Sequence, residues 1–111
     1  MLPAKPNHSA RVVTTLLTPA PDKREEFLQT LRSLRVEISR EPGCRLCAVF
    51  ADIDGGHHFV LLSEWQDQAS LLAHMASDHF RILSGASRLL GSTAEFRFAT
   101  SEPNAPAFPS P

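Results

Sequence analysis

The residues best suited to chemistry lie between Trp65 and His79. Trp65 ends an apolar run typical of a strand, Asp67 follows as a helix N-cap, and His74 lies on the helix that begins there. An imidazole can accept a proton near neutral pH, and an indole offers a flat wall on which an aromatic molecule can stack. This order predicts a ring and a base near one end of a single sheet, with His79 as a second candidate base.

Trp65 and His74 also allow a purely structural interpretation. Trp65 could pack in the core with its indole N–H satisfied, and His74 could be a boundary residue at the edge of an apolar helix stripe. If Trp65 instead faces a pocket, alternate residues of its strand share that pocket, and apolar residues of the helices form the opposite walls. The predicted pocket lining is Phe27, Leu31, Phe59, Leu61, Ser63, Ile82 and Leu83.

Glu64 and the two cysteines are interpreted as structural residues. Glu64 points away from the predicted pocket and would need a cationic partner such as Arg45, Arg97 or an arginine of a second subunit. Cys44 and Cys47 form a C-x-x-C pair in an apolar run that is typical of a strand, where an offset of three sends the two side chains to opposite faces. We therefore expect two small, partly buried apolar residues and no redox pair.

Composition and spacing exclude several classes of protein. The histidines lack the i, i+4 spacing of a helical metal site, and no Cys/His cluster or glycine-rich phosphate loop is present, so neither a metal nor another cofactor is expected. The formal charge is −1 with no basic run, which argues against nucleic acid binding. No apolar run reaches the ~20 residues that cross a bilayer, and residues 1–10 lack the apolar core of a secretory signal, so a cytoplasmic location is expected.

Turn and breaker residues divide the chain into alternating strands and helices. The sequence Glu41-Pro42-Gly43 ends the first helix, and Asp54-Gly55-Gly56 predicts an antiparallel hairpin between two strands. The expected strands cover residues 11–18, 45–51, 58–65 and 93–100, and the expected helices cover 22–39, 67–75 and 77–90. The domain is expected to span 10–100, between a flexible arm at 1–9 and a proline-rich tail at 101–111 with Phe108 as its apolar anchor.

This order of elements predicts an α+β fold, a ferredoxin-like β-α-β-β-α-β sandwich with a four-stranded antiparallel sheet. With both helical segments on one side, the other sheet face would be bare, yet strand segments such as CAVF and FVLL are apolar on both faces. A monomer would then expose a large apolar patch. The pattern therefore predicts a homodimer that pairs through the sheet faces.

The chain resembles the antibiotic biosynthesis monooxygenase (ABM) family over roughly residues 10 to 100. The matching residues are Glu41-Pro42-Gly43-Cys44, Glu64-Trp65, Leu71, His74 and Ser77-Asp78-His79-Phe80. The resemblance implies a dimeric α+β barrel, and several members oxygenate quinol-like or polyphenolic molecules without metal or flavin. It also implies that Trp65 lines the active-site pocket, and it favours His74 over His79. One branch of the wider fold binds haem, but by alignment this chain has His74 and Ser84 at two of that branch's key positions and no Asn in the first strand.

Three functions follow as hypotheses. The first, which takes its oxygen chemistry from the resemblance, is a cofactor-independent monooxygenase that uses dioxygen on a small quinol-like or polyphenolic molecule. The second is an isomerase or processing enzyme for a small phosphorylated sugar-derived molecule, for which Arg81 or Arg88 could supply a cation. The third is a non-catalytic dimeric module that binds a small ligand.

Overall fold

The sheet and helices are described by a computed structural model over residues 10–55, 57–89 and 93–101. The expected N-terminal arm, Gly56 of the hairpin turn and residues 102–111 of the expected tail, with Phe108, lie outside the described residues. The elements are β1 (Ala10–Thr18), a short 3-10 helix η1 (Pro21–Lys23), α1 (Arg24–Ser39), β2 (Cys44–Ala51), β3 (Phe59–Trp65), α2 (Gln68–Met75), α3 (Asp78–Leu89) and β4 (Thr93–Ser101).

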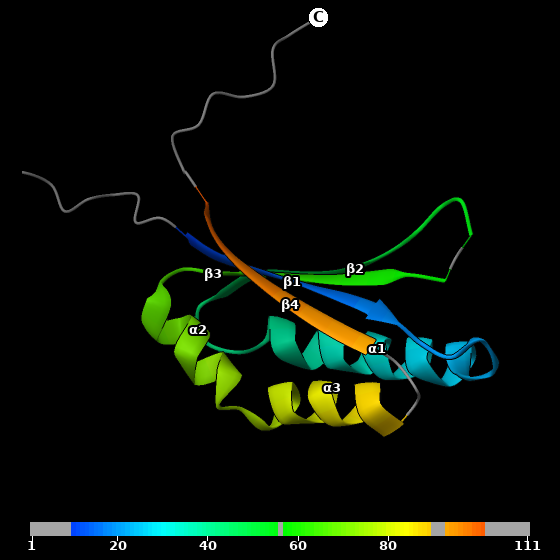
Figure 1. Ribbon diagram of the computed structural model, residues 1–111. Helices are drawn as coiled ribbons and strands as arrows, with labels where there is room; N and C mark the ends of the chain where they lie inside the picture. The colour runs from blue at the N-terminus through cyan, green and yellow to red at the C-terminus, as the bar shows by residue number, and fades with distance from the viewer. Residues whose placement is uncertain (1–9, 56, 90–92, 102–111) are drawn as a thin grey trace, which may run out of the picture.

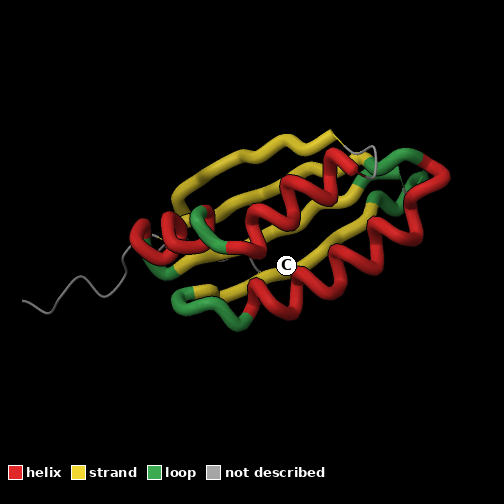
Figure 2. Tube along the Cα trace, turned by 90° about the horizontal axis from the view of Figure 1, so that it is seen from below, coloured by secondary structure: helices red, strands yellow, loops and turns green. Residues whose placement is uncertain are grey.

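The described strands form one antiparallel sheet in the order β2-β3-β1-β4. The helices α1, α2 and α3 all lie on the same side of this sheet (Figure 1), and a view from below shows them covering that face (Figure 2). The predicted ferredoxin-like α+β sandwich and the predicted hairpin between β2 and β3 are confirmed. Among the described residues, no helix combines the length and the apolar character needed to cross a bilayer.

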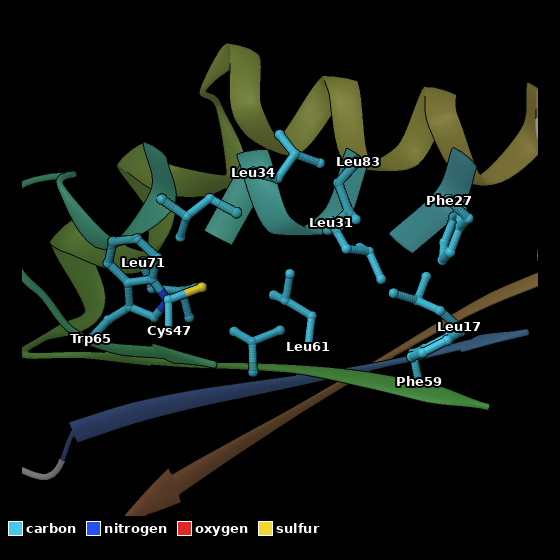
Figure 3. Packing of buried hydrophobic residues seen from close by; sticks show 12 residues of the cluster. Leu17, Phe27, Leu31, Leu34, Cys47, Phe59, Leu61, Trp65, Leu71 and Leu83 are labelled. Atoms are coloured by element: carbon cyan, nitrogen blue, oxygen red, sulfur yellow. The ribbon is translucent and has the colours of Figure 1, made fainter. Parts of the chain in front are cut away.

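The core lies between α1 and the sheet (Figure 3). The apolar stripe of α1 has offsets of 4, 3 and 4 residues, which is the spacing of one helix face. Its four members, Phe27, Leu31, Leu34 and Ile38, are each at most 5% exposed. Trp65 lies at one end of this core, beside Cys47 and Leu71, and Phe27 and Phe59 lie at the other end.

The start of α2 is fixed by a capping hydrogen bond. The Asp67 side chain accepts from the Ser70 backbone N–H at 2.8 Å, which satisfies one of the free donors of the first turn. Helix α2 ends at Met75. Where α3 begins, the Ser77 hydroxyl accepts a hydrogen bond from the Phe80 N–H at 3.2 Å. Both caps agree with the sequence pattern. The change of direction between α2 and α3 lets α3 pack beside α1.

Glu41, Pro42 and Gly43 form the turn that joins α1 to β2. Gly43 has a φ of 83°, a left-handed conformation that glycine adopts without steric cost. Its carbonyl accepts from the Gln66 N–H at 2.8 Å, so the turn is attached to the segment between β3 and α2. A side chain at this position would overlap the Ser70 hydroxyl. The turn therefore holds Gly43 close to the first residues of α2.

The prediction that Cys44 and Cys47 face opposite sides of the sheet is wrong. The register of β2 against β3 shifts between Cys44 and Leu46, so that Cys44 pairs with Trp65 and Cys47 pairs with Ser63. One extra residue at this bulge changes the side-chain alternation and turns both cysteines towards the helices. Both thiols are free and pack against the core, Cys47 being buried and Cys44 half-buried.

Candidate functional site

Trp65 of β3 and His74 of α2 meet at one end of the sheet. Their rings are stacked with centroids 4.4 Å apart and planes 21° apart. Trp65 is fully buried and His74 is 2% exposed. The indole N–H donates to the Ser63 hydroxyl at 3.0 Å. The structure thus brings together the ring and the first candidate base, but one face of the indole is covered by the imidazole, where the sequence predicts a stacked substrate.

The Glu41 carboxylate connects the two candidate bases. It lies 3.1 and 3.2 Å from Nδ1 of His74, and 2.8 Å from Nδ1 of His79. An ionised carboxylate only accepts hydrogen bonds, so each Nδ1 carries the donated hydrogen. In a neutral imidazole the other nitrogen, Nε2, then keeps its lone pair. Glu41 therefore selects the form of His74 in which Nε2 can accept a proton.

Burial lowers the pKa of His74 from its ordinary value of 6.5, because an imidazolium ion is poorly solvated in this position. The Glu41 charge and hydrogen bond act in the opposite direction, and the nearby His79 lowers the pKa further. The lowered pKa favours the neutral imidazole, which is the form that can accept a proton.

Phenylalanine rings enclose the remaining side of the cluster. Phe80 of α3 meets the His74 ring edge-on, with centroids 5.5 Å apart and an interplanar angle of 83°. Phe80 in turn packs against Phe96 of β4 at 5.2 Å. The base therefore lies in an aromatic environment built from β3, α2, α3 and β4.

Two grooves flank this cluster. The first, of about 360 Å³, lies between α2 and β4, and its lining includes Arg11, Leu71, Met75 and Phe98. Leu71 and Met75 are neighbours of His74 on α2, and Arg11 pairs with Trp65 across β1 and β3. The second, of about 380 Å³, lies between α2 and α3 and includes Phe80. Both grooves therefore adjoin neighbours of His74, while His74 itself lines neither.

The residues predicted to line the pocket have a different role. All of them except Ile82 are at most 1% exposed and fill the space between helices and sheet; these are Phe27, Leu31, Phe59, Leu61, Ser63 and Leu83. Ile82 is 49% exposed and lies outside the core. Glu64 is half-buried on the other sheet face, where its register partners are Val12 and Leu46. Glu41 was not predicted as a site residue, since the sequence shows it only as part of a helix-ending turn.

Glu41, His74 and His79 are residue types that can bind a metal ion. Within the described part of the chain, no group of three or more His, Cys, Asp or Glu side chains is arranged to hold a metal ion. What the arrangement offers chemically is an oriented, buried, neutral base next to aromatic rings.

The fold and this cluster define a ferredoxin-like α+β domain with a buried base at one end of its sheet. The sequence model of the antibiotic biosynthesis monooxygenase (ABM) family matches residues 10–83, and the chain belongs to this family.

The chain is also similar to individual proteins in sequence and in structure. The chain is 34% identical over 61 residues to the protein named "Putative monooxygenase YcnE" from Bacillus subtilis (strain 168), a match that covers 55% of this chain and 64% of that protein. A conserved protein from Methanosarcina mazei Go1 superposes with a TM-score of 0.76 at 27% identity, covering 85% of this chain and 94% of the other.

A further solved structure shares the fold at lower identity. SnoaB, a cofactor-independent oxygenase from Streptomyces nogalater whose mutant structure was solved, superposes with a TM-score of 0.77. The two chains are 20% identical, and the superposition covers 90% of this chain and 100% of SnoaB. At this identity the comparison supports the fold and carries no residue roles.

Proposed function

We propose that the protein is a cofactor-independent monooxygenase that uses dioxygen on a small quinol-like or polyphenolic molecule, with His74 as the base. The observation that carries this proposal is the position of His74, which is buried against Trp65 and has its Nδ1 hydrogen-bonded to Glu41. Membership of the ABM family supports the reaction class. Trp65 then acts by holding the His74 ring in place, and His79 acts through their shared partner Glu41.

The chemistry needs one proton acceptor and no external reductant. His74 takes the phenolic proton, because a phenolate gives an electron to dioxygen far more readily than a neutral phenol. One oxygen atom is then added to a ring carbon and becomes a carbonyl. The other oxygen atom leaves as water with two hydrogens of the substrate, one from the O–H and one from the ring C–H. The substrate supplies all four electrons that reduce dioxygen.

The groove between α2 and β4 is the proposed substrate site. Its apolar walls, with Leu71, Met75 and Phe98, suit a flat aromatic body, and Leu71 and Met75 adjoin His74 on α2. Arg11 and Gln68 give this groove a polar end, where the Arg11 Nε–H donates to the Gln68 side-chain oxygen at 2.9 Å. A guanidinium there favours a substrate that becomes an anion.

Oxygen consumption by metal-stripped protein tests this proposal. The substrates are a panel of hydroquinones, naphthols and anthrones, and the variants are His74→Ala and, as a matched control, His57→Ala, which removes an exposed imidazole near the hairpin. We expect uptake that falls at least tenfold in the His74 variant and is unchanged in the control. Absence of uptake on the whole panel, or equal rates in both variants, would contradict the proposal.

The protein is further proposed to act as a homodimer that forms a dimeric α+β barrel through the sheet faces. The sheet face turned away from the helices exposes Leu16, Leu46 and Phe50 by 40%, 45% and 54%. Leu16, Phe50 and Val60 lie side by side in the register of β1, β3 and β2. Burying these side chains removes apolar surface from water.

Sedimentation of the wild type and of Phe50→Glu tests the dimer. We expect a dimer that dissociates in this variant. Leu89→Glu places the same charge on an exposed leucine of α3 and should leave the assembly intact. A wild-type monomer at all concentrations would contradict the dimer.

A second function is favoured by the groove between α2 and α3. Two arginines, Arg81 and Arg88, line this groove, with Arg81 paired to Asp78. Two guanidinium groups suit a small phosphorylated molecule, so an isomerase or processing activity is the alternative. Conversion of such a molecule without oxygen uptake, and its loss in Arg88→Ala, would favour this function over oxygenation.

A further inference from the structure

A second cleft lies away from the proposed active site. It has a volume of about 360 Å³ and is bounded by α1 and the edge strand β2. Its apolar residues include Leu28, Val49 and Phe59, and its charged residues are Arg24, Arg32 and Arg35 of α1. Phe59 lies at the end of the core opposite Trp65 (Figure 3), and none of the cleft's lining residues belongs to the His74 cluster.

The three arginines concentrate positive charge on one side of a helix. Together with Leu28 they occupy positions 24, 28, 32 and 35, with offsets of 4, 4 and 3 that place them along one stripe. Arg24 pairs with Glu25 at 3.3 Å, and its guanidinium lies 5.2 Å from the centre of the Phe59 ring. Arg32 and Arg35 have no ion-pair partner within the described part of the chain.

This arrangement is unfavourable for stability alone. Like charges three residues apart on a helix repel each other, and among the described residues no acidic side chain is paired with Arg32 or Arg35. The chain as a whole has a formal charge of −1, so the cluster does not follow from a generally basic composition. Local arrangements that disfavour folding are expected at sites that bind a ligand.

We propose that this cleft binds a small anion with a flat apolar body, such as an aromatic carboxylate. Arg32 and Arg35 would hold the anionic group, since a guanidinium matches a carboxylate with two parallel hydrogen bonds. Leu28 and Val49, which are only partly buried, would contact the apolar body. The volume is in the usual range for small-molecule sites, which favours a small ligand over an acidic peptide. This site does not depend on the proposed oxygenase activity.

Isothermal titration of the full chain tests the site. The probe is 2-naphthoate, compared with its neutral analogue 2-naphthylmethanol, with inorganic phosphate and with an oligo-glutamate peptide. The variant is Arg32→Gln with Arg35→Gln, and the matched control is Arg40→Gln, which removes an exposed arginine just after α1 and outside the cleft. Because the double variant removes a repulsion, we expect it to fold with a thermal midpoint equal to or above that of the wild type.

The proposal requires that 2-naphthoate binds at least tenfold more tightly than each of the three comparison probes. It also requires that the double variant loses this binding at least tenfold and that Arg40→Gln retains it. Equal binding by the double variant would place the naphthoate elsewhere and overturn the proposal. Equal affinity for the neutral analogue, for phosphate alone or for the peptide would overturn the assigned ligand class.

Discussion

Replacing Gly43 by alanine should destabilise the fold by two separable effects. The residue has a φ of 83°, and the left-handed conformation costs an L-residue about 1–2 kcal/mol. The added Cβ would also overlap the Ser70 hydroxyl and lie 2.5 Å from the Ser70 Cβ, and such overpacking typically costs about 1–3 kcal/mol. The expected loss is therefore roughly 2–5 kcal/mol, which corresponds to a fall in Tm of at least about 8 °C.

The assay is urea unfolding of the wild type, Gly43→Ala and Gly85→Ala. Gly85 lies in α3, and a Cβ there would meet no atom within 4 Å. Gly85→Ala should accordingly stabilise the protein by about 0.5–1 kcal/mol, because alanine loses less entropy in a helix. Ser70→Gly in the wild-type and Gly43→Ala backgrounds then completes a double-mutant cycle that isolates the steric part.

Two results would refute this reasoning. One is a free energy of unfolding for Gly43→Ala within about 0.5 kcal/mol of the wild type, since surface substitutions without a special mechanism stay in that range. The other is a double-mutant cycle with no coupling between positions 43 and 70, because the overlap with Ser70 predicts that removing its side chain restores part of the loss.

Four further predictions follow from individual contacts. Asp67→Ala should lower the free energy of unfolding by about 0.5–2 kcal/mol, while Asp67→Asn, which can still cap α2, should lose less in thermal unfolding. Burial raises the pKa of the Cys47 thiol from 9.0 to about 12, so between these pH values the thiol ionises only in the unfolded state. The free energy of unfolding of the wild type should therefore fall above pH 9, by at most about 1.4 kcal/mol per pH unit. Cys47→Ala should lack this component of the pH dependence. The pKa of His74 is lowered from 6.5, so in acid the imidazole of the unfolded state binds a proton more readily than that of the folded state. The free energy of unfolding of the wild type should therefore fall as the pH drops below 6.5, and it should fall more steeply than that of His74→Gln. Glu41→Gln should reduce oxygen uptake at least tenfold with little change in KM, because the amide replaces one of the two acceptor oxygens with an NH2 donor. Retention of kcat would contradict the role of Glu41.

Most of the fold is predictable from local signals. The helix stripe of α1, the Asp67 cap and the turn at Gly43 each depend on a few neighbouring residues, and the structure shows all three. The cysteine orientation is not predictable in this way. The bulge after Cys44 is defined only by how β2 aligns with β3, so strand alternation alone gave opposite faces for Cys44 and Cys47.

The candidate site depends even more on long-range contacts. Glu41 and His74 are 33 residues apart in sequence, and their contact requires the turn at Gly43 to be joined to the segment before α2. A carboxylate next to a helix-ending proline is usually exposed, so no local pattern marks Glu41 as a partner of two imidazoles. The expected pocket lining shows the reverse problem, because periodicity identifies which side chains point inwards but not whether they leave an open space.

The stack of Trp65 on His74 makes the site visible by spectroscopy. Trp65 is the chain's single tryptophan, so all of the protein's indole emission comes from a ring 4.4 Å from the imidazole. A protonated imidazole quenches an excited indole more strongly than a neutral one. Fluorescence intensity and lifetime therefore report the charge of His74 in the unmodified protein, without any substrate. Ligands that shift the proton affinity of the base can then be screened optically before the reaction itself is known.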